Sequence, residues 1–271
     1  MSAFITHFAF EFRTGLRNST QLMMNYLFPL GFYVMTGLVM TQVNPGFRET
    51  MAPAMVVFVI LAATMLGLPG PLVESREAGI YRSFKINGVP AASILSIPAL
   101  SAVIHALIAS TVVALTAAPL FGGRAPTNWL AFAGVTLLAA LSCGALGALI
   151  GVMASNSRSV VLYSQLVFLP SMLIGGLMMP LTVLPAGVRP ISALLPSAHA
   201  MQAFQGLAYG EAAAWSPWLA VGVLAAGGLI ALALAIYLFN WDSNNATRRG
   251  HPLLALLALA PYVASLALVA G

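Results

Sequence analysis

The chain has very little charge. Only 6% of its 271 residues are Asp, Glu, Lys or Arg, whereas a soluble globular domain has about 25% charged residues. Apolar residues make up 60% of the chain, and its mean hydropathy is +0.95. A soluble surface cannot be built from so few charges. The composition therefore excludes a soluble globular protein and predicts an integral membrane protein.

Cysteine and lysine each occur once. Cys143 lies in an apolar run and can form neither a disulfide framework nor a cysteine metal cluster, so we interpret it as a small packing residue. Lys85 stands in RSFKIN with no glycine before it, whereas a phosphate loop needs G-x-x-x-x-G-K-[ST]. The chain is therefore not expected to bind ATP itself, and energy for moving a solute would come from a partner.

The apolar runs also lack acidic residues. All six acids lie at or outside the borders of these runs: Glu11, Glu49, Glu74, Glu77, Glu211 and Asp242. A charge inside the bilayer is costly and usually marks an ion pathway, so an ion-coupled carrier is expected to embed more ionisable groups. His105 does lie within a run. We interpret it as a hydrogen-bonded packing residue, with a proton relay as the alternative.

Seven apolar segments predict transmembrane helices, since a span needs about 20 mostly apolar residues. They are roughly 22–43, 51–73, 90–118, 129–154, 159–181, 216–240 and 252–270. Pro252 and Pro261 interrupt the last one, which predicts a span, a hairpin or an interfacial helix. Basic residues favour the cytoplasmic side. With a cytoplasmic N-terminus, only Arg48, Arg124 and Arg189 lie outside, and the other eight of the eleven lie inside: Arg13, Arg17, Arg76, Arg82, Lys85, Arg158, Arg248 and Arg249.

Two further segments are partly apolar. Residues 1–21 predict an amphipathic helix on the membrane surface, with an ordinary helix start as the alternative. Its apolar side holds Phe4, Ile5, Phe8, Phe12 and Leu16, and its polar side holds His7, Glu11, Thr14, Arg17 and Asn18. Residues 182–213 are interrupted by Pro185, Pro190 and Pro196. They predict broken re-entrant helices at the outer face, with a structured external loop as the alternative.

One stretch gathers the charge that the rest of the chain lacks. LVESREAGIYRSFKINGVP, residues 72–90, places five charges within about three helical turns: Glu74, Arg76, Glu77, Arg82 and Lys85. Asn87-Gly88 and Pro90 then predict a turn. A short amphipathic helix of mixed charge suits docking of a soluble partner. A topology signal is the alternative, but it explains only the basic residues, because acids contribute little to orientation.

This stretch resembles the loop after the second span in membrane subunits of the ABC transporter type-2 export family. The matching residues are Glu74, Arg76, Glu77, Gly79, Arg82, Lys85 and Pro90. GGLMMPLTVLPAGVRPISALLPSAHAMQAFQGLAYGE is similar to the family's outer segment at Pro180, Leu184, Pro185, Leu195, Pro196 and His199. The resemblance covers roughly residues 1–245 and departs from the usual six spans in its last helix.

The resemblance implies an all-α polytopic membrane protein with six core transmembrane helices, to which the last apolar segment of this chain would add a seventh. Residues 1–21 would be an interface helix and 22–245 a permease domain, with a coupling loop at 74–90 and a re-entrant segment at 182–213. Beyond the resemblance, residues 246–271 would be a cytoplasmic linker and an extra C-terminal hydrophobic helix. The protein would be multi-pass in a prokaryotic inner or plasma membrane, with its N-terminus in the cytoplasm.

The resemblance also implies partners and roles. A non-catalytic permease, without a cofactor or metal of its own, would pair as a homodimer above two ATPase subunits that bind ATP and Mg. Membrane lipids would surround it, and no nucleic acid is expected. The residues that would dock the ATPase are Glu74, Arg76, Glu77, Gly79, Arg82 and Lys85. The residues of an extracellular gate would be Pro185, Pro196 and His199.

The implied function is ATP-driven export, by alternating access, of a hydrophobic or amphipathic substrate such as a drug, an antibiotic, a lipid or a glycolipid. A secondary carrier or channel is one alternative, and a non-transporting assembly or sensor subunit is another. Within the spans, Gly147 and Gly151 stand four residues apart. This spacing predicts close helix packing within one subunit rather than a dimer seam.

Overall fold

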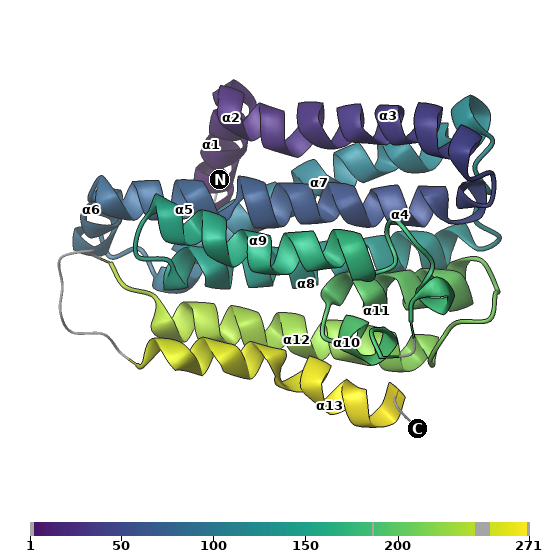
Figure 1. The fold of residues 1–271 in the computed structure, drawn as a ribbon. Coiled ribbons are helices and arrows are strands. Elements are labelled where there is room, and N and C mark those ends of the chain that lie inside the picture. The colour runs from purple at the N-terminus through teal and green to yellow at the C-terminus, as the bar shows by residue number, and fades with distance from the viewer. Residues whose placement is uncertain (1–2, 186, 242–249, 270–271) are drawn as a thin grey trace.

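The chain folds into a bundle of long helices, shown in Figure 1. The computed structural model describes residues 3–185, 187–241 and 250–269, and no β-strand occurs within these ranges. Seven helical runs are long and apolar enough to cross a membrane: Ser19–Val43, Phe47–Glu77, Ala91–Phe121, Trp129–Met153, Ser157–Ile174, Pro217–Leu238 and Pro252–Val269. The predicted all-α polytopic fold is confirmed. Asp242, Arg248 and Arg249, with the predicted linker around them, lie outside the described residues.

Three of the runs are composite. The first joins α2 (Ser19–Leu22), the π-helical η1 (Met23–Leu27) and α3 (Phe28–Val43); the second joins α4 (Phe47–Leu61), the π-helical η2 (Ala62–Gly67) and α5 (Pro69–Glu77). The seventh joins η5 (Pro252–Leu259) and α13 (Ala260–Val269). The other four runs are single helices: α7 (Ala91–Phe121), α8 (Trp129–Met153), α9 (Ser157–Ile174) and α12 (Pro217–Leu238).

Helix ends follow local sequence signals, as the fifth run shows. Asn156 Oδ1 accepts a hydrogen bond of 3.0 Å from the Ser159 N–H and so caps the start of α9. The predicted apolar segment extends to residue 181, but α9 ends at Ile174. Gly176 then adopts a φ of 88°, a left-handed conformation that glycine allows and that ends helices.

The second run, Phe47–Glu77, is the centre of the bundle. In its most apolar stretch 94% of the residues are buried, and helices α3, α7, α8 and α9 pack against it. In the first, fifth and seventh runs only 28%, 22% and 17% are buried. Apolar faces of this extent are not stable in water. They suit the hydrocarbon chains of a bilayer or the face of another helix.

Helix α8 approaches the central run through two glycines. A Cβ atom added at Gly147 would collide with the backbone oxygen of Thr64, and one added at Gly151 would lie 2.8 Å from Cδ1 of Leu72. Small residues at such positions let helix backbones come close together. The predicted packing role within one subunit is confirmed.

Gly147→Ala is expected to lower the free energy of unfolding by about 1–3 kcal/mol, because the backbone of Thr64 cannot move aside as a side-chain tip could. Gly134→Ala is the matched control on the same helix, since an added Cβ there meets no described atom within 4 Å. Thermal unfolding of both variants in one detergent measures the difference. Equal midpoints would contradict this packing.

Helix α1 (Ala3–Arg17) lies across the end of the bundle, at a steep angle to the spans in Figure 1. Three residues of its predicted apolar side are exposed: Phe4, Ile5 and Leu16. Phe12 instead stacks on His105 of α7, with ring centroids 4.4 Å apart. Glu11 of the predicted polar side is partly buried, because it faces a polar cleft inside the chain.

Short helices fill the opposite end, between α9 and α12. They are η3 (Leu181–Val183), α10 (Arg189–Ser192), α11 (Pro196–Ala203) and the π-helical η4 (Phe204–Ala208). Every residue of α11 is buried, and its neighbours are α4, α8, α9 and α12. The segment predicted to be broken and re-entrant therefore consists of broken helices packed into the bundle. Its depth in a membrane stays a prediction.

The last run lies antiparallel beside α12 (Figure 1). Tyr262 of this run is fully buried against α12, where a Cβ added at Gly227 would come within 2.6 Å of its ring. Of the three forms left open by the sequence, the run has the length and the packing of a span.

This arrangement predicts chain termini on opposite sides of the membrane. A cysteine appended after Gly271 should react in intact cells with a membrane-impermeant maleimide, whereas Ser2→Cys should react only after lysis. The native Cys143 is 2% exposed and should stay unlabelled. Labelling of both positions only after lysis would show that the last run does not cross.

Candidate functional site

The charged stretch forms one end of the bundle, at the left in Figure 1. Helix α5 ends at Glu77, and Gly79 adopts a φ of 74°, which glycine allows without strain, before α6 (Ile80–Ile86) begins. Gly88, with a φ of 72°, forms a second turn before α7. The sequence predicted one helix for all five charges. The structure divides them between two helices, because the turn at Gly79 ends the first.

Most of the predicted docking residues lie at the surface. Glu74 and Glu77 are exposed on α5, and Arg82 and Lys85 are exposed on α6. Gly79 lies at the turn between these pairs. Acidic and basic side chains thus stand on adjoining short helices, which suits a partner of mixed charge.

Arg76 lies elsewhere, inside the chain. Its guanidinium donates a hydrogen bond of 3.1 Å to the Val152 carbonyl and a second, shorter one to the Ala154 carbonyl, at the end of α8. The last carbonyls of a helix have no partner within it and carry partial negative charge, so a cation there is favourable. The helical spacing could have predicted that Arg76 points into the chain. Leu72 and Val73, four and three residues earlier, lie on the same side of α5 and are buried.

Aromatic contacts hold the inner side of α6. Tyr81 is buried, with its ring centroid 5.4 Å from that of Phe239, just after α12. Burial raises the pKa of Tyr81, so it stays a neutral phenol at physiological pH. The Phe84 ring lies 5.3 Å from that of His7 on α1. Helix α6 is therefore packed against both α1 and the end of α12.

Two exposed apolar residues of α6 escaped the sequence prediction. Ile80 is 46% exposed and Ile86 is 80% exposed. Large apolar side chains at the surface beside charges are typical of a protein interface. The available signal was their position, since both isoleucines flank the basic residues in a segment outside the apolar runs.

The three predicted gate residues do not converge on one site. Pro185 is exposed, whereas Pro196 and His199 are buried in α11. His199 Nε2 donates a hydrogen bond of 2.8 Å to the Ala193 carbonyl, and its ring centroid lies 5.7 Å from that of Tyr262. Burial lowers the pKa of His199 to about 4, so it is neutral at pH 7. His199 thus joins α11 to the last run.

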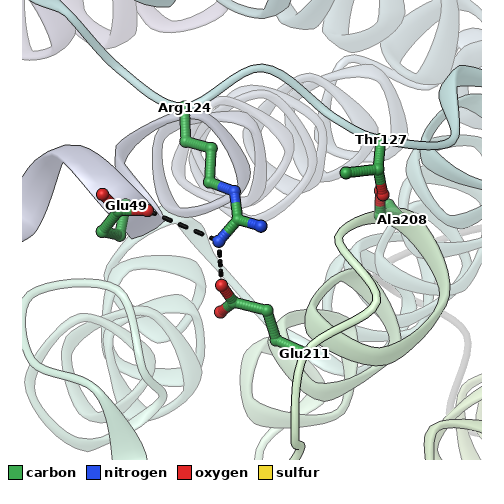
Figure 2. A network of polar contacts seen from close by, with 5 residues as sticks. All are labelled: Glu49, Arg124, Thr127, Ala208 and Glu211. Atoms are coloured by element: carbon green, nitrogen blue, oxygen red, sulfur yellow. Dashed lines mark hydrogen bonds and ion pairs between the residues drawn. The ribbon is translucent and has the colours of Figure 1, made fainter.

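A polar cluster that the sequence did not predict connects loops at this end, as Figure 2 shows. Arg124 Nη1 lies 3.5 Å from Glu49 Oε2 on α4 and forms a closer ion pair with Glu211, which follows η4. Nearby, Thr127 Oγ1 donates a hydrogen bond of 2.8 Å to the Ala208 carbonyl. The cluster fastens the α7–α8 loop to the first turn of α4 and to η4 with the segment that follows it. The sequence did contain a signal for this cluster, since Glu49, Arg124 and Glu211 are all in segments predicted to lie on the outer side of the membrane.

The fold and its two ends define a class: a polytopic helical membrane protein with a mixed charged and apolar surface at one end and packed short helices at the other. The model of the ABC-2 type transporter family matches residues 2–209, and the chain belongs to this family. The chain is 27% identical over 199 residues to "Putative transport permease YvfS" of Bacillus subtilis (strain 168), covering 70% of this chain and 78% of that protein. No solved structure matches the chain. The resemblance predicted from the sequence is confirmed, and the chain is a membrane subunit of a transporter.

Proposed function

We propose that this chain is the permease of an ATP-driven exporter and that α5 and α6 dock a separate ATPase subunit. The observation that carries the proposal is the exposed surface of these helices, where Glu74, Glu77, Arg82 and Lys85 surround Ile80 and Ile86. The chain has no phosphate loop. ATP and Mg would be bound by the ATPase, and the chain would carry no cofactor.

Movement would enter through α6. Two ATPase subunits beneath two permease copies would close on binding ATP and shift the docked helices. Contacts of Tyr81 with Phe239 and of Phe84 with His7 would carry the shift to α12 and α1. Helix α5 continues the central run, which reaches the far end at Glu49. There the Arg124 cluster and the buried α11 would open and close the exit.

The substrate path would run between two copies along exposed apolar faces. The first run has a shallow groove of about 850 Å³ lined mainly by Leu22, Met23, Tyr26, Leu27, Leu30 and Val34. A second copy facing this groove would enclose an apolar path. Such a path suits a hydrophobic or amphipathic substrate, in the range of drugs, antibiotics, lipids and glycolipids.

The test is co-purification followed by reconstitution. The tagged permease, isolated from its native membrane, should bring down a soluble subunit with a Walker lysine motif. In proteoliposomes the pair should move fluorescent amphiphiles only when ATP is supplied. Substrate flux by the permease alone, with no ATPase bound, would overturn the proposal and favour a secondary carrier.

A further inference from the structure

A polar cleft lies between α1, the first run and the second run, at the end of the bundle that carries α5. Its outer part is a cavity of about 110 Å³ with four polar residues in its wall: Asn18, Thr20, Gln21 and Glu74. Its inner part, of about 20 Å³, is lined by the polar residues Glu11, Gln21, Asn25, Ser101 and His105. Gln21, Gly67 and Pro71 belong to both parts. Among the described residues, no lysine or arginine lines either part.

Two atoms at the inner end lack a hydrogen-bond partner within the described chain: Asn25 Oδ1 and His105 Nε2. Asn25 is 5% exposed and His105 is 2% exposed. A buried polar atom without a partner costs about 1–3 kcal/mol. The His105 ring is held by stacking on Phe12 and by its Nδ1, 2.6 Å from the Tyr26 hydroxyl. When Nδ1 donates its proton to Tyr26, Nε2 is an acceptor that faces the cleft.

Two glycines lie directly against these acceptors. A Cβ added at Gly15 would lie 2.9 Å from Gln21 Oε1 and 3.2 Å from His105 Nε2. A Cβ added at Gly67 would lie 2.6 Å from Asn25 Oδ1. The π-helical turns η1 and η2 pack against each other here, and such turns occur frequently at functional sites. The backbone thus closes directly over a space that a side chain would fill.

We propose that this cleft binds a primary ammonium group. The group has three N–H donors and no acceptor, which matches Asn25 Oδ1, His105 Nε2 and an oxygen of Glu11 or Gln21. The inner part holds about one water-sized group, so it fits –NH3⁺ but not a trimethylammonium. The outer part has room for the carbon stem, and Glu74 adds negative charge there.

The inference rests on the proposed function, because it makes amphipathic primary amines the substrate class of the permease. Burial raises the pKa of the Glu11 carboxyl, and a cation beside that carboxyl would offset the cost of burying its charge. The cleft lies beside α5, so an amine bound there touches the helix that leads into the docking surface.

The probe is dansylcadaverine, a fluorescent primary amine, and its N-acetyl derivative is the matched control without the charge. Both are titrated onto the full-length protein in nanodiscs, and the signal of empty nanodiscs is subtracted. Saturable binding is expected for the amine alone. Asn25→Leu removes one acceptor, and Gly15→Ala places a methyl group beside two others. Each should weaken amine binding at least about tenfold.

Ser164→Ala is the control variant. It removes a buried hydroxyl that, among the described residues, has no hydrogen-bond partner, and it lies on α9, away from the cleft. It should bind the amine like the parent protein. Gly15→Ala is expected to fold, because the atom nearest to its added Cβ is the movable end of Gln21, and the contact of 3.2 Å with His105 Nε2 needs only a shift of a few tenths of an ångström. Equal binding of both probes, no saturable binding of either, or parental affinity in Gly15→Ala would overturn the inference. The assay needs neither an ATPase nor transport, so its outcome is separate from that of the proposed function.

Discussion

Replacing Glu74 and Glu77 together with alanine is expected to abolish ATP-dependent transport while the protein still folds and inserts. Both side chains are exposed on α5. Surface substitutions of this kind usually change stability by no more than about 0.5 kcal/mol. Charges at the rim of an interface orient the partner and select it. Their removal should weaken ATPase binding and separate ATP hydrolysis from transport.

The measurement compares flux and ATPase affinity in proteoliposomes. Arg158→Ala is the control, because it removes an exposed charge at the same end of the bundle but outside α5 and α6. Glu77→Ala alone distinguishes docking from amine binding, since Glu74 lines the polar cleft and Glu77 does not. Full transport by the double variant would rule out docking through these acids.

Arg76→Ala is expected to have the largest effect on stability, a loss of about 3 kcal/mol, because it removes two charge-assisted hydrogen bonds to carbonyls at the end of α8. Arg76→Lys should recover only part of the loss, since an ammonium does not have the planar fork that reaches both carbonyls. Lys85→Ala, which removes an exposed charge from the same stretch, should leave stability nearly unchanged.

Unfolding midpoints of the three variants in one detergent measure these differences. If Arg76→Ala unfolds at the same midpoint as Lys85→Ala, the buried cap on α8 does not contribute to stability. If it folds normally but loses ATPase binding, Arg76 belongs to the docking surface after all. The structure predicts that Arg76→Ala unfolds at a lower midpoint than Lys85→Ala and that its main effect is on stability rather than on ATPase binding.

The spans could be predicted because length and apolar composition determine them locally. The position of the charged end followed in the same way, since the charges are adjacent in sequence. Spacing could show the side of α5 on which Arg76 lies, but its hydrogen-bond partners could not be predicted, because Val152 and Ala154 are distant in the chain. Arg124 presents the same difficulty, with one partner in the first turn of α4 and another in the segment after η4. Charge patterns in the sequence identify candidate functional residues, but whether each of these side chains is buried depends on which helices pack together.

The polar cleft could not be predicted from the sequence at all. Its inner end combines α1, the first run, the second run and α7, and only packing brings these together. Asn25 and Gln21 are single polar residues at the start of an apolar segment, where a cap or a solvated border explains them equally well. His105 was interpreted as a packing residue, and its stacking on Phe12 agrees with that. Its second ring nitrogen is what connects it to the cleft.

Crosslinking from Ile86 tests the central claim, that α6 docks a separate ATPase, most directly. Ile86→Cys, labelled with benzophenone maleimide, places a photoreactive group on a residue that is 80% exposed, while the native Cys143 is buried. Leu130→Cys is the control, being 84% exposed on α8 at the end near the Arg124 cluster. We expect illumination of the assembled transporter to join the ATPase subunit to position 86 and not to position 130. Absence of a crosslink at 86, or equal crosslinking at both positions, would contradict the account.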